Sequence, residues 1–307
     1  ARLDAVFLSP HKFLGGPGSA GLLIFDESLY PHDLAPSVGG GGTVRYVNAD
    51  VHDYLEDVEA RETAGTPGLY QVLRAAYALD VKRSVGVDVI RDREHAHLER
   101  VLDVWGSHDR IDILGPDAID RLSIVSFNVL DGRGRVLHPR FVTVLLDDLF
   151  GVQSRAGCSC AGPYGHHLLG IGAAKADRFR SCITDGIYGL RPGWARVGFH
   201  YSHDDDEVGY LLDAVAFVAD HGARFLSLYT FEVESGAWIH RDGRTATPRY
   251  GLDALPVALE DVTGAARKRL FESALEDAHR IAAGLPDLEG GTLPGEIADL
   301  QFFAVPA

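Results

Sequence analysis

The sequence predicts an α/β protein, because short apolar runs typical of strands alternate with segments whose apolar residues recur at helical spacing. Residues 5–8 and 22–25 form two such runs, and the segment between them is too rich in Gly and Pro to continue either strand. Helical spacing extends from about residue 70 to residue 105, with Gly86 as a break. Beyond it, strands and helices alternate as far as about residue 222, which indicates a small α+β domain.

Lys12 follows directly after the first apolar run, which we expect to be a buried strand. A lysine partly withdrawn from water offers a neutral amine that can attack an aldehyde, as a Schiff-base lysine does. Lysine is otherwise scarce, at positions 82, 175 and 268. The alternative is an ordinary lysine in a turn.

A helix is predicted to begin with Thr66 as N-cap and Pro67 at its first position. Its inward face is predicted to carry Leu69, Val72, Leu73, Ala76 and Leu79. The free N–H groups and the hydroxyl could bind a phosphate, although a simple capped helix is the commoner case. Gly39 to Gly42, upstream, is typical of a flexible linker.

The second half of the chain carries further predicted elements. Strands are expected at 111–114, 122–130 and 191–201, the last with Trp194 and Arg196 on one face. The other predictions are a hairpin-like turn at 131–134, a helix from His138-Pro139 to near Gly151, a helix capped by Ser202, and a charged helix near 265–283. We find no chemistry in the tail beyond about residue 224. Its aromatic residues Tyr229, Phe231 and Trp238 suggest packing against a missing part of the protein or a partner.

Charge and composition exclude several classes of function. Lys+Arg 29 against Asp+Glu 44 gives a net charge of −15, so nucleic acid and anionic membrane are not expected partners. No apolar run approaches the roughly 20 residues that span a bilayer. The three cysteines are an odd number with close spacing, which favours a reducing compartment, and we expect a cytoplasmic location.

Two of these cysteines, Cys158 and Cys160, precede a pair of histidines at 166 and 167. The spacing is close to that of a zinc site, but structural zinc sites usually have two to four residues between the cysteines, and we expect no metal. A buried structural pair of cysteines is a second interpretation.

The segment Ser9-Pro-His11-Lys12, with the Gly-rich turn after it, resembles the cofactor-lysine segment of class V aminotransferase-fold enzymes, which use pyridoxal phosphate (PLP) and include the cysteine desulfurases. The resemblance implies PLP-dependent transferase fold type I, with a mostly parallel seven-stranded sheet. It places the Schiff base on Lys12 and the cofactor phosphate on Ser9 and His11. It also implies that the N-terminal half of the cofactor domain is missing from this sequence, so that the chain is the C-terminal part of a longer protein.

Two further segments match the family in order. Gly65-Thr66-Pro67 resembles the end of the family's E-x-G-T-P motif, which implies that Thr66 binds the cofactor phosphate of the partner subunit in a homodimer, with the Gly39–Gly42 loop near the neighbour's site. The R-x-G-x-x-C loop puts Arg155 on the substrate carboxylate and Cys160 at the persulfide-forming nucleophile. Arg196 aligns with a family arginine near the substrate, although a structural surface arginine is an equal interpretation. Cys158 stands where desulfurases often have histidine, which is a departure from the pattern.

The resemblance predicts a remnant of the PLP-binding domain at 1–85, a small α+β domain at 86–223 and an extension of unknown role at 224–307. The predicted function is a PLP-dependent enzyme similar to cysteine desulfurases and selenocysteine lyases, acting on an amino acid. One alternative is a class V transaminase, lyase or epimerase in which Cys160 is structural. Another is a non-catalytic fragment that serves for dimerisation and substrate binding.

Overall fold

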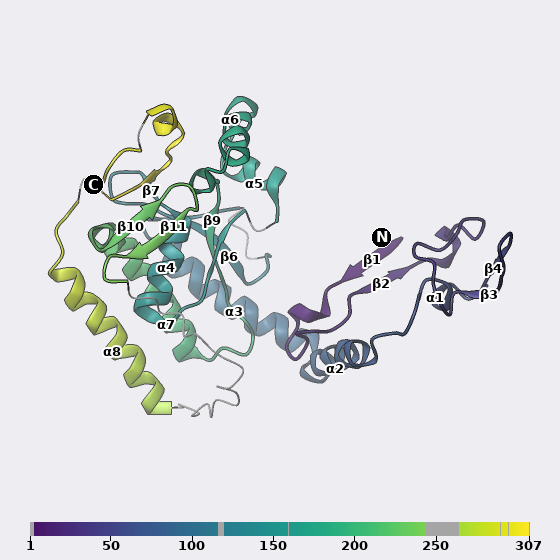
Figure 1. Ribbon diagram of the computed structural model, residues 1–307. Helices are drawn as coiled ribbons and strands as arrows, with labels where there is room; N and C mark the ends of the chain where they lie inside the picture. Colours follow the sequence, from purple (N-terminus) through teal and green to yellow (C-terminus); the bar gives the residue numbers. More distant parts are fainter. Residues whose placement is uncertain are drawn as a thin grey trace. The chain divides into compact units, whose positions relative to one another are not determined.

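The chain divides into two compact units, Ala1–Ile90 and Arg91–Ala307 (Figure 1). The computed structural model describes residues 3–115, 120–158, 160–243, 264–288, 290–293 and 295–306. Its mixture of helices and strands agrees with the predicted α/β class. The predicted boundary after residue 85 lies near the observed division, and the described residues beyond 224 fall in the same unit as residues 91–223.

The first unit is built from two separate antiparallel ribbons and one long helix. The elements are β1 (Ala5–Leu8), η1 (Pro10–Lys12), β2 (Leu22–Phe25), η2 (Glu27–Leu29), β3 (Val44–Val47), β4 (His52–Tyr54), α1 (Val58–Arg61) and α2 (Leu69–Val85). Among the described strands, β1 pairs only with β2, and β3 only with β4. Helix α3 (Val87–Trp105) begins in this unit after the break at Gly86, as the sequence predicts.

The first unit buries few apolar side chains, which corrects two predictions. β1 is a strand with the predicted bounds, but it is not buried, and Phe7 is 80% exposed. A two-stranded ribbon has no second layer on which to bury a face. Helix α2 is capped by Gly68 rather than Thr66. Its buried side chains are Ala75 and Ala78, while most of the predicted inward positions, Leu69, Val72, Leu73 and Leu79, are exposed.

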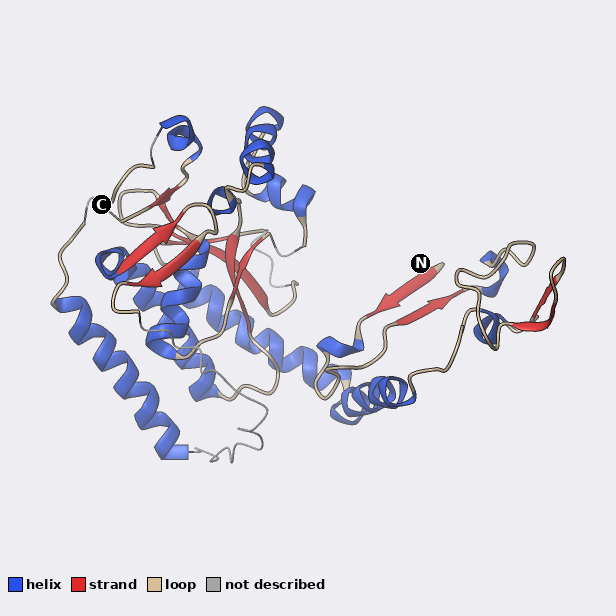
Figure 2. Ribbon diagram, in the orientation of Figure 1, coloured by secondary structure: helices blue, strands red, loops and turns tan. Residues whose placement is uncertain are grey.

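The second unit contains a four-stranded antiparallel sheet in the order β5-β6-β9-β8 (Figure 2). Its strands are β5 (Ile111–Ile113), β6 (Ile124–Val129), β8 (Arg155–Gly157) and β9 (Trp194–Gly198). Phe127 of β6 is fully buried, and its ring centroid lies 5.1 Å from that of Trp105 on α3. The sheet therefore shares its core with α3.

Helix α4 (Pro139–Phe150) packs on β6, β8 and β9 and also contacts α7 (Asp205–His221) and α8 (Gly264–Ala283). His138 is its N-cap, Pro139 its first residue, and Gly151 ends it in the left-handed conformation with φ 64°. These are the ends that the sequence predicts. The inward residues are Phe141, Val142, Leu145 and Leu146, all buried. The sheet and its helices thus form two packed layers.

The remaining elements of this unit lie outside the four-stranded sheet. They are β7 (Val136–Leu137), α5 (Gly162–Leu168), α6 (Ala173–Thr184), η3 (Tyr188–Leu190), η4 (Gly222–Leu228), β10 (Tyr229–Glu232), β11 (Ala237–His240), η6 (Gly295–Leu300) and β12 (Phe303–Ala304). β12 pairs in parallel with β7. In the described residues, no helix combines the length and the apolar character that a bilayer span requires.

The aromatic residues of the tail pack inside the second unit, contrary to the prediction that they face a missing part or a partner. Tyr229 and Trp238 are buried, and both rings contact Phe141 of α4. The Tyr229 hydroxyl donates to Asp148 at 2.7 Å. The hydrophobic core thus accounts for these aromatics without another chain.

Candidate functional site

Three predicted cofactor-binding residues lie on one tight turn of the first unit. η1 follows β1 directly, with Ser9 at its N-cap and Pro10, His11 and Lys12 in the turn. The Lys12 N–H donates to the Ser9 carbonyl at 3.0 Å. Proline suits the first position because its φ is fixed and it needs no N–H partner. A hydroxyl, an imidazole and an amine therefore lie within four consecutive residues.

The Gly-rich segment after Lys12 folds back against this turn and is held there by α2. A Cβ at Gly16 would lie 1.8 Å from the Pro10 carbonyl oxygen, so only glycine fits. The Ala20 N–H donates to the Gln71 carbonyl at 3.0 Å, and Arg74 Nη1 donates to the Pro17 carbonyl at 2.6 Å. The turn is thus fixed to a long helix of its own unit.

Lys12 is exposed, which corrects the prediction that its side chain is partly withdrawn from water. That prediction depended on the burial of β1, and β1 is not buried. Among the described residues, no hydrogen bond or ion pair engages the Lys12 amine, so an aldehyde can reach it. Ser9 and His11 add donors for a phosphate. This donor set fits the aldehyde and phosphate groups of PLP.

The Gly39–Gly42 loop and the segment that carries Thr66 lie together in the first unit. The Gly65 N–H donates to the Gly41 carbonyl at 2.8 Å. A Cβ at Gly40 would approach the Ala64 side chain to 3.1 Å. Thr66 itself is exposed. The loop is therefore not a free linker, because it packs on the residues before Thr66.

In the second unit, Arg155 and Cys160 are in direct contact. Arg155 begins β8, and its Nη2 donates to Cys160 Sγ at 3.3 Å. Cys160 is exposed, and it is the only non-glycine residue with positive φ among the described residues, at 65°. A non-glycine residue in this conformation costs roughly 1–2 kcal/mol, and such strain is concentrated at functional sites. The turn thus presents an accessible thiol beside a guanidinium.

Cys158 differs from Cys160 in its exposure and in its hydrogen bond. Its Sγ donates to the Pro192 carbonyl at 2.9 Å. Burial raises the pKa of the Cys158 thiol, and the nearby charge of Arg191 opposes that shift only in part. The interpretation of both cysteines as a buried pair is therefore wrong, since only Cys158 is withdrawn from water. Within the described residues, no group of three His, Cys, Asp or Glu side chains is placed to hold a metal ion.

Arg196 lies opposite Arg155 in the pairing of β8 with β9, so both side chains leave the same face of the sheet. Together they line a cleft of about 700 Å³, which we call the Arg155–Arg196 cleft. Its wall also includes Tyr210 of α7 and Phe271 of α8, whose rings stack with centroids 4.0 Å apart. The structure thus brings the two predicted substrate-binding arginines together. Phe271 lies 75 residues from Arg196 in the sequence, and no motif marks it.

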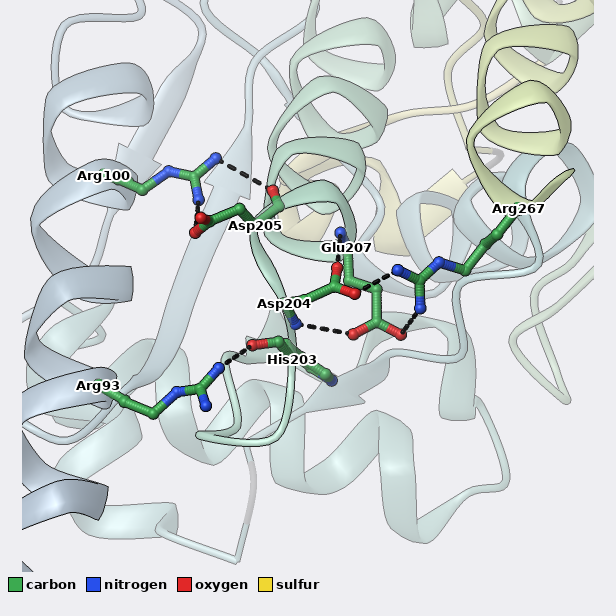
Figure 3. Close-up of polar contacts among 7 residues, drawn as sticks. All are labelled: Arg93, Arg100, His203, Asp204, Asp205, Glu207 and Arg267. Atoms are coloured by element: carbon green, nitrogen blue, oxygen red, sulfur yellow. Dashed lines mark hydrogen bonds and ion pairs between the residues drawn. The ribbon is translucent and has the colours of Figure 1, made fainter. Parts of the chain in front are cut away.

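The first turn of α7, next to this cleft, is held by arginines from two other helices (Figure 3). Asp204 is the N-cap and forms a capping box with Glu207, so the observed cap lies two residues after the predicted cap Ser202. Arg267 of α8 pairs with Asp204 and, at 3.3 Å, with Glu207. From α3, Arg93 donates to the His203 carbonyl at 3.1 Å, and Arg100 pairs with Asp205 at 3.2 Å.

Comparison with known proteins gives a consistent family. The family model "Aminotransferase class-V" matches residues 1–211. A probable cysteine desulfurase of Halobacterium salinarum is 32% identical over 216 residues, which are 70% of this chain and 45% of that protein. A probable cysteine desulfurase of Streptomyces coelicolor is 30% identical over 218 residues, 71% of this chain and 45% of the relative. The chain thus spans less than half the length of these relatives.

Solved structures agree with this. The apo structure of a cysteine desulfurase from Thermococcus onnurineus has a TM-score of 0.56 and 26% identity, covering 71% of this chain and 47% of that one. A cysteine desulfurase of Escherichia coli has a TM-score of 0.54 at 21% identity, covering 69% of this chain and 45% of that one, and shows likeness of fold alone.

Proposed function

The chain belongs to the class V aminotransferase family, and from this premise we propose that the intact protein is a PLP-dependent enzyme that removes sulfur from cysteine, or selenium from selenocysteine. The contact between Arg155 and Cys160 carries this proposal. Relatives named as cysteine desulfurases support it at about 30% identity.

Each proposed role follows from the chemistry of the side chain. The amine of Lys12 would hold the aldehyde of PLP and would carry the proton of the substrate Cα, while Ser9 and His11 would bind the cofactor phosphate. The planar fork of Arg155 pairs with the substrate carboxylate, assisted by Arg196 across the strand pair. Bound PLP supplies an electron sink for the carbanion that forms at Cα.

Cys160 then accepts the sulfur. Its thiolate attacks the substrate sulfur, an S–S bond forms, and the substrate C–S bond breaks. A proton replaces sulfur on the carbon, so cysteine and a thiol give alanine and a persulfide, and no external oxidant is required. The neighbouring guanidinium of Arg155 stabilises the anionic thiolate.

We propose a homodimer in which Thr66 binds the cofactor phosphate of the neighbouring subunit. The packing of the Gly39–Gly42 loop on the segment before Thr66 supports this, because it would place both features in one interface. Three free cysteines suit a reducing compartment such as the cytoplasm.

Alanine release from cysteine by the full-length protein tests the proposed reaction. In Cys160→Ser the rate should fall by at least about a hundredfold, because the hydroxyl is not a nucleophile toward sulfur. Cys158→Ser is the matched control and should retain most of the activity, since the Cys158 thiol is hydrogen-bonded to the Pro192 carbonyl.

Unchanged alanine release by Cys160→Ser would refute the role of Cys160. Transfer of the amino group to a keto acid by the same variant would then identify a class V transaminase with a structural Cys160.

A further inference from the structure

A second cleft of about 610 Å³ also has Arg155 in its wall. It is lined by β8 and by the residues just before β9. It extends over Cys160 to helix α6 and to the N-terminal turn of α4. Four arginines line it: Arg140, Arg155, Arg180 and Arg191. We call it the arginine cleft.

The arginine cleft is strongly cationic in a chain of net charge −15. No aspartate or glutamate is among the residues that line it. In the part of the chain that the structure describes, Arg180 and Arg191 have no ion pair with a carboxylate. Among the described residues, the Arg155 side chain makes one hydrogen bond, to the Cys160 sulfur at 3.3 Å. A cleft lined by one sign of charge concentrates ions of the opposite sign.

Arg140 is held in place by uncharged acceptors. Its Nη1 donates to the carbonyls of Ser235 at 2.7 Å and Gly236 at 3.1 Å. Burial, and next the positive charge of Arg191, lower the pKa of Arg140. Two guanidinium groups are thus kept near each other without a counter-charge, and a bound anion would relieve their repulsion.

His138 adds no charge to the cleft at neutral pH. Burial lowers the pKa of its imidazole to about 4, and Nε2 lies 3.1 Å from the Gly189 carbonyl. Its Nδ1 accepts a hydrogen bond from the backbone N–H of Arg140 at 3.1 Å. The imidazole therefore fixes the end of α4, and the positive charge beside it comes from the arginines.

We propose that the arginine cleft is a binding site for a small polyanion, carrying phosphate or several carboxylate groups, next to Cys160. Such groups pair with guanidinium through two parallel hydrogen bonds. The single carboxylate of an amino acid needs no more than Arg155 and Arg196, whereas Arg140, Arg180 and Arg191 do not line the Arg155–Arg196 cleft. The polyanion is therefore a second ligand, distinct from the proposed substrate.

Calorimetric titration of the full-length protein with inorganic pyrophosphate, and separately with citrate, tests this proposal. PLP is kept saturating, so that the cofactor's own phosphate site is occupied. We expect binding of at least one probe, with an affinity about tenfold lower or more in Arg180→Gln and in Arg191→Gln. The preference between the two probes distinguishes phosphate-bearing from carboxylate-bearing ligands.

Arg178→Gln is the matched control on the same helix, because Arg178 pairs with Asp299 and does not line the cleft. It should bind the probes as the unmodified protein does. Thermal unfolding of all variants shows whether the exposed substitutions leave the fold intact. Equal affinity in all three variants, or no binding of either probe, would overturn the proposal.

Cys160→Ala separates this inference from the proposed reaction. It should bind the polyanion with unchanged affinity, because the arginines provide the binding, while alanine release is lost. Probe binding that depends on the arginines, together with normal alanine release by Cys160→Ala, would uphold the site and refute the reaction.

Discussion

The two units of the chain differ in how completely each covers its own apolar side chains. The second unit closes a core of large residues such as Trp105, Phe127 and Phe199, all fully buried. Among the described residues of the first unit, Ala75 and Ala78 are the only buried apolar side chains apart from prolines, while Phe7 and Tyr70 are more than three-quarters exposed. The second unit can therefore be stable through its own packing, and the first has little of its own to stabilise it.

Two substitutions of phenylalanine by alanine, one in each unit, test this difference most directly. Phe127→Ala should lower the free energy of unfolding by about 3–5 kcal/mol, because it leaves a cavity in a closed core. The same change at Phe7 should cost less than about 0.5 kcal/mol, since that ring is in solvent. Denaturant unfolding of the full-length variants measures both.

A cost of several kcal/mol at Phe7 would show that the ring is buried in the full-length protein. The exposed face of β1 would then be an interface with residues outside this sequence or with another subunit.

A smaller effect is expected on the stability of the second unit when the pH is lowered. The folded pKa of His138, about 4, lies below its ordinary value of 6.5, so the unfolded chain binds the proton more readily. Its contribution to stability is complete above about pH 6.5 and is lost as the pH falls through 4, by on the order of 3 kcal/mol. His138→Asn keeps an acceptor at the N-cap and removes the titration. Its unfolding free energy should decline less than that of the unmodified protein between these pH values.

A third test concerns the N-cap of α7. Asp204 caps α7 with a full capping box, whereas Gly68 caps α2 without a side-chain hydrogen bond. Asp204→Ala should cost about 1 kcal/mol, within a range of 0.5–2. Asp206→Ala, in the same turn but outside the box, is the control and should cost less, since it removes only a charge near the helix dipole. Equal losses would show that the capping box adds nothing beyond charge.

Local signals were sufficient where the chain itself supplies both ends of an element. Helix α4 runs from Pro139 to Phe150 as predicted, because a proline and a left-handed glycine fix its ends. The bounds of β1 and β2 were also correct. The predicted cap Ser202 was two residues early, because the carboxylate of Asp204 accepts the Glu207 N–H, and the Asp204 backbone N–H donates to the Glu207 carboxylate in return.

Burial could not be predicted in the same way, because it depends on distant partners. The apolar run before Lys12 predicts a buried strand only if other strands flank it, and β1 has β2 alone. The roles of Tyr229 and Trp238 depended on α4, more than 70 residues earlier, which the local pattern does not indicate. The pairing of Arg155 with Arg196 likewise became visible only through strand register. The candidate site residues were predicted from motifs, whereas a neighbour such as Phe271 was found only through the fold.

The parallel pairing of β12 with β7 has a consequence for synthesis of the protein. Phe303, Ala304 and Val305 are buried in a core whose other members begin as early as Leu98. A ribosome must therefore add some 200 residues after Leu98 before the last piece of this core leaves the exit tunnel. Until then the incomplete domain exposes apolar surface, which chaperones that hold nascent chains can bind.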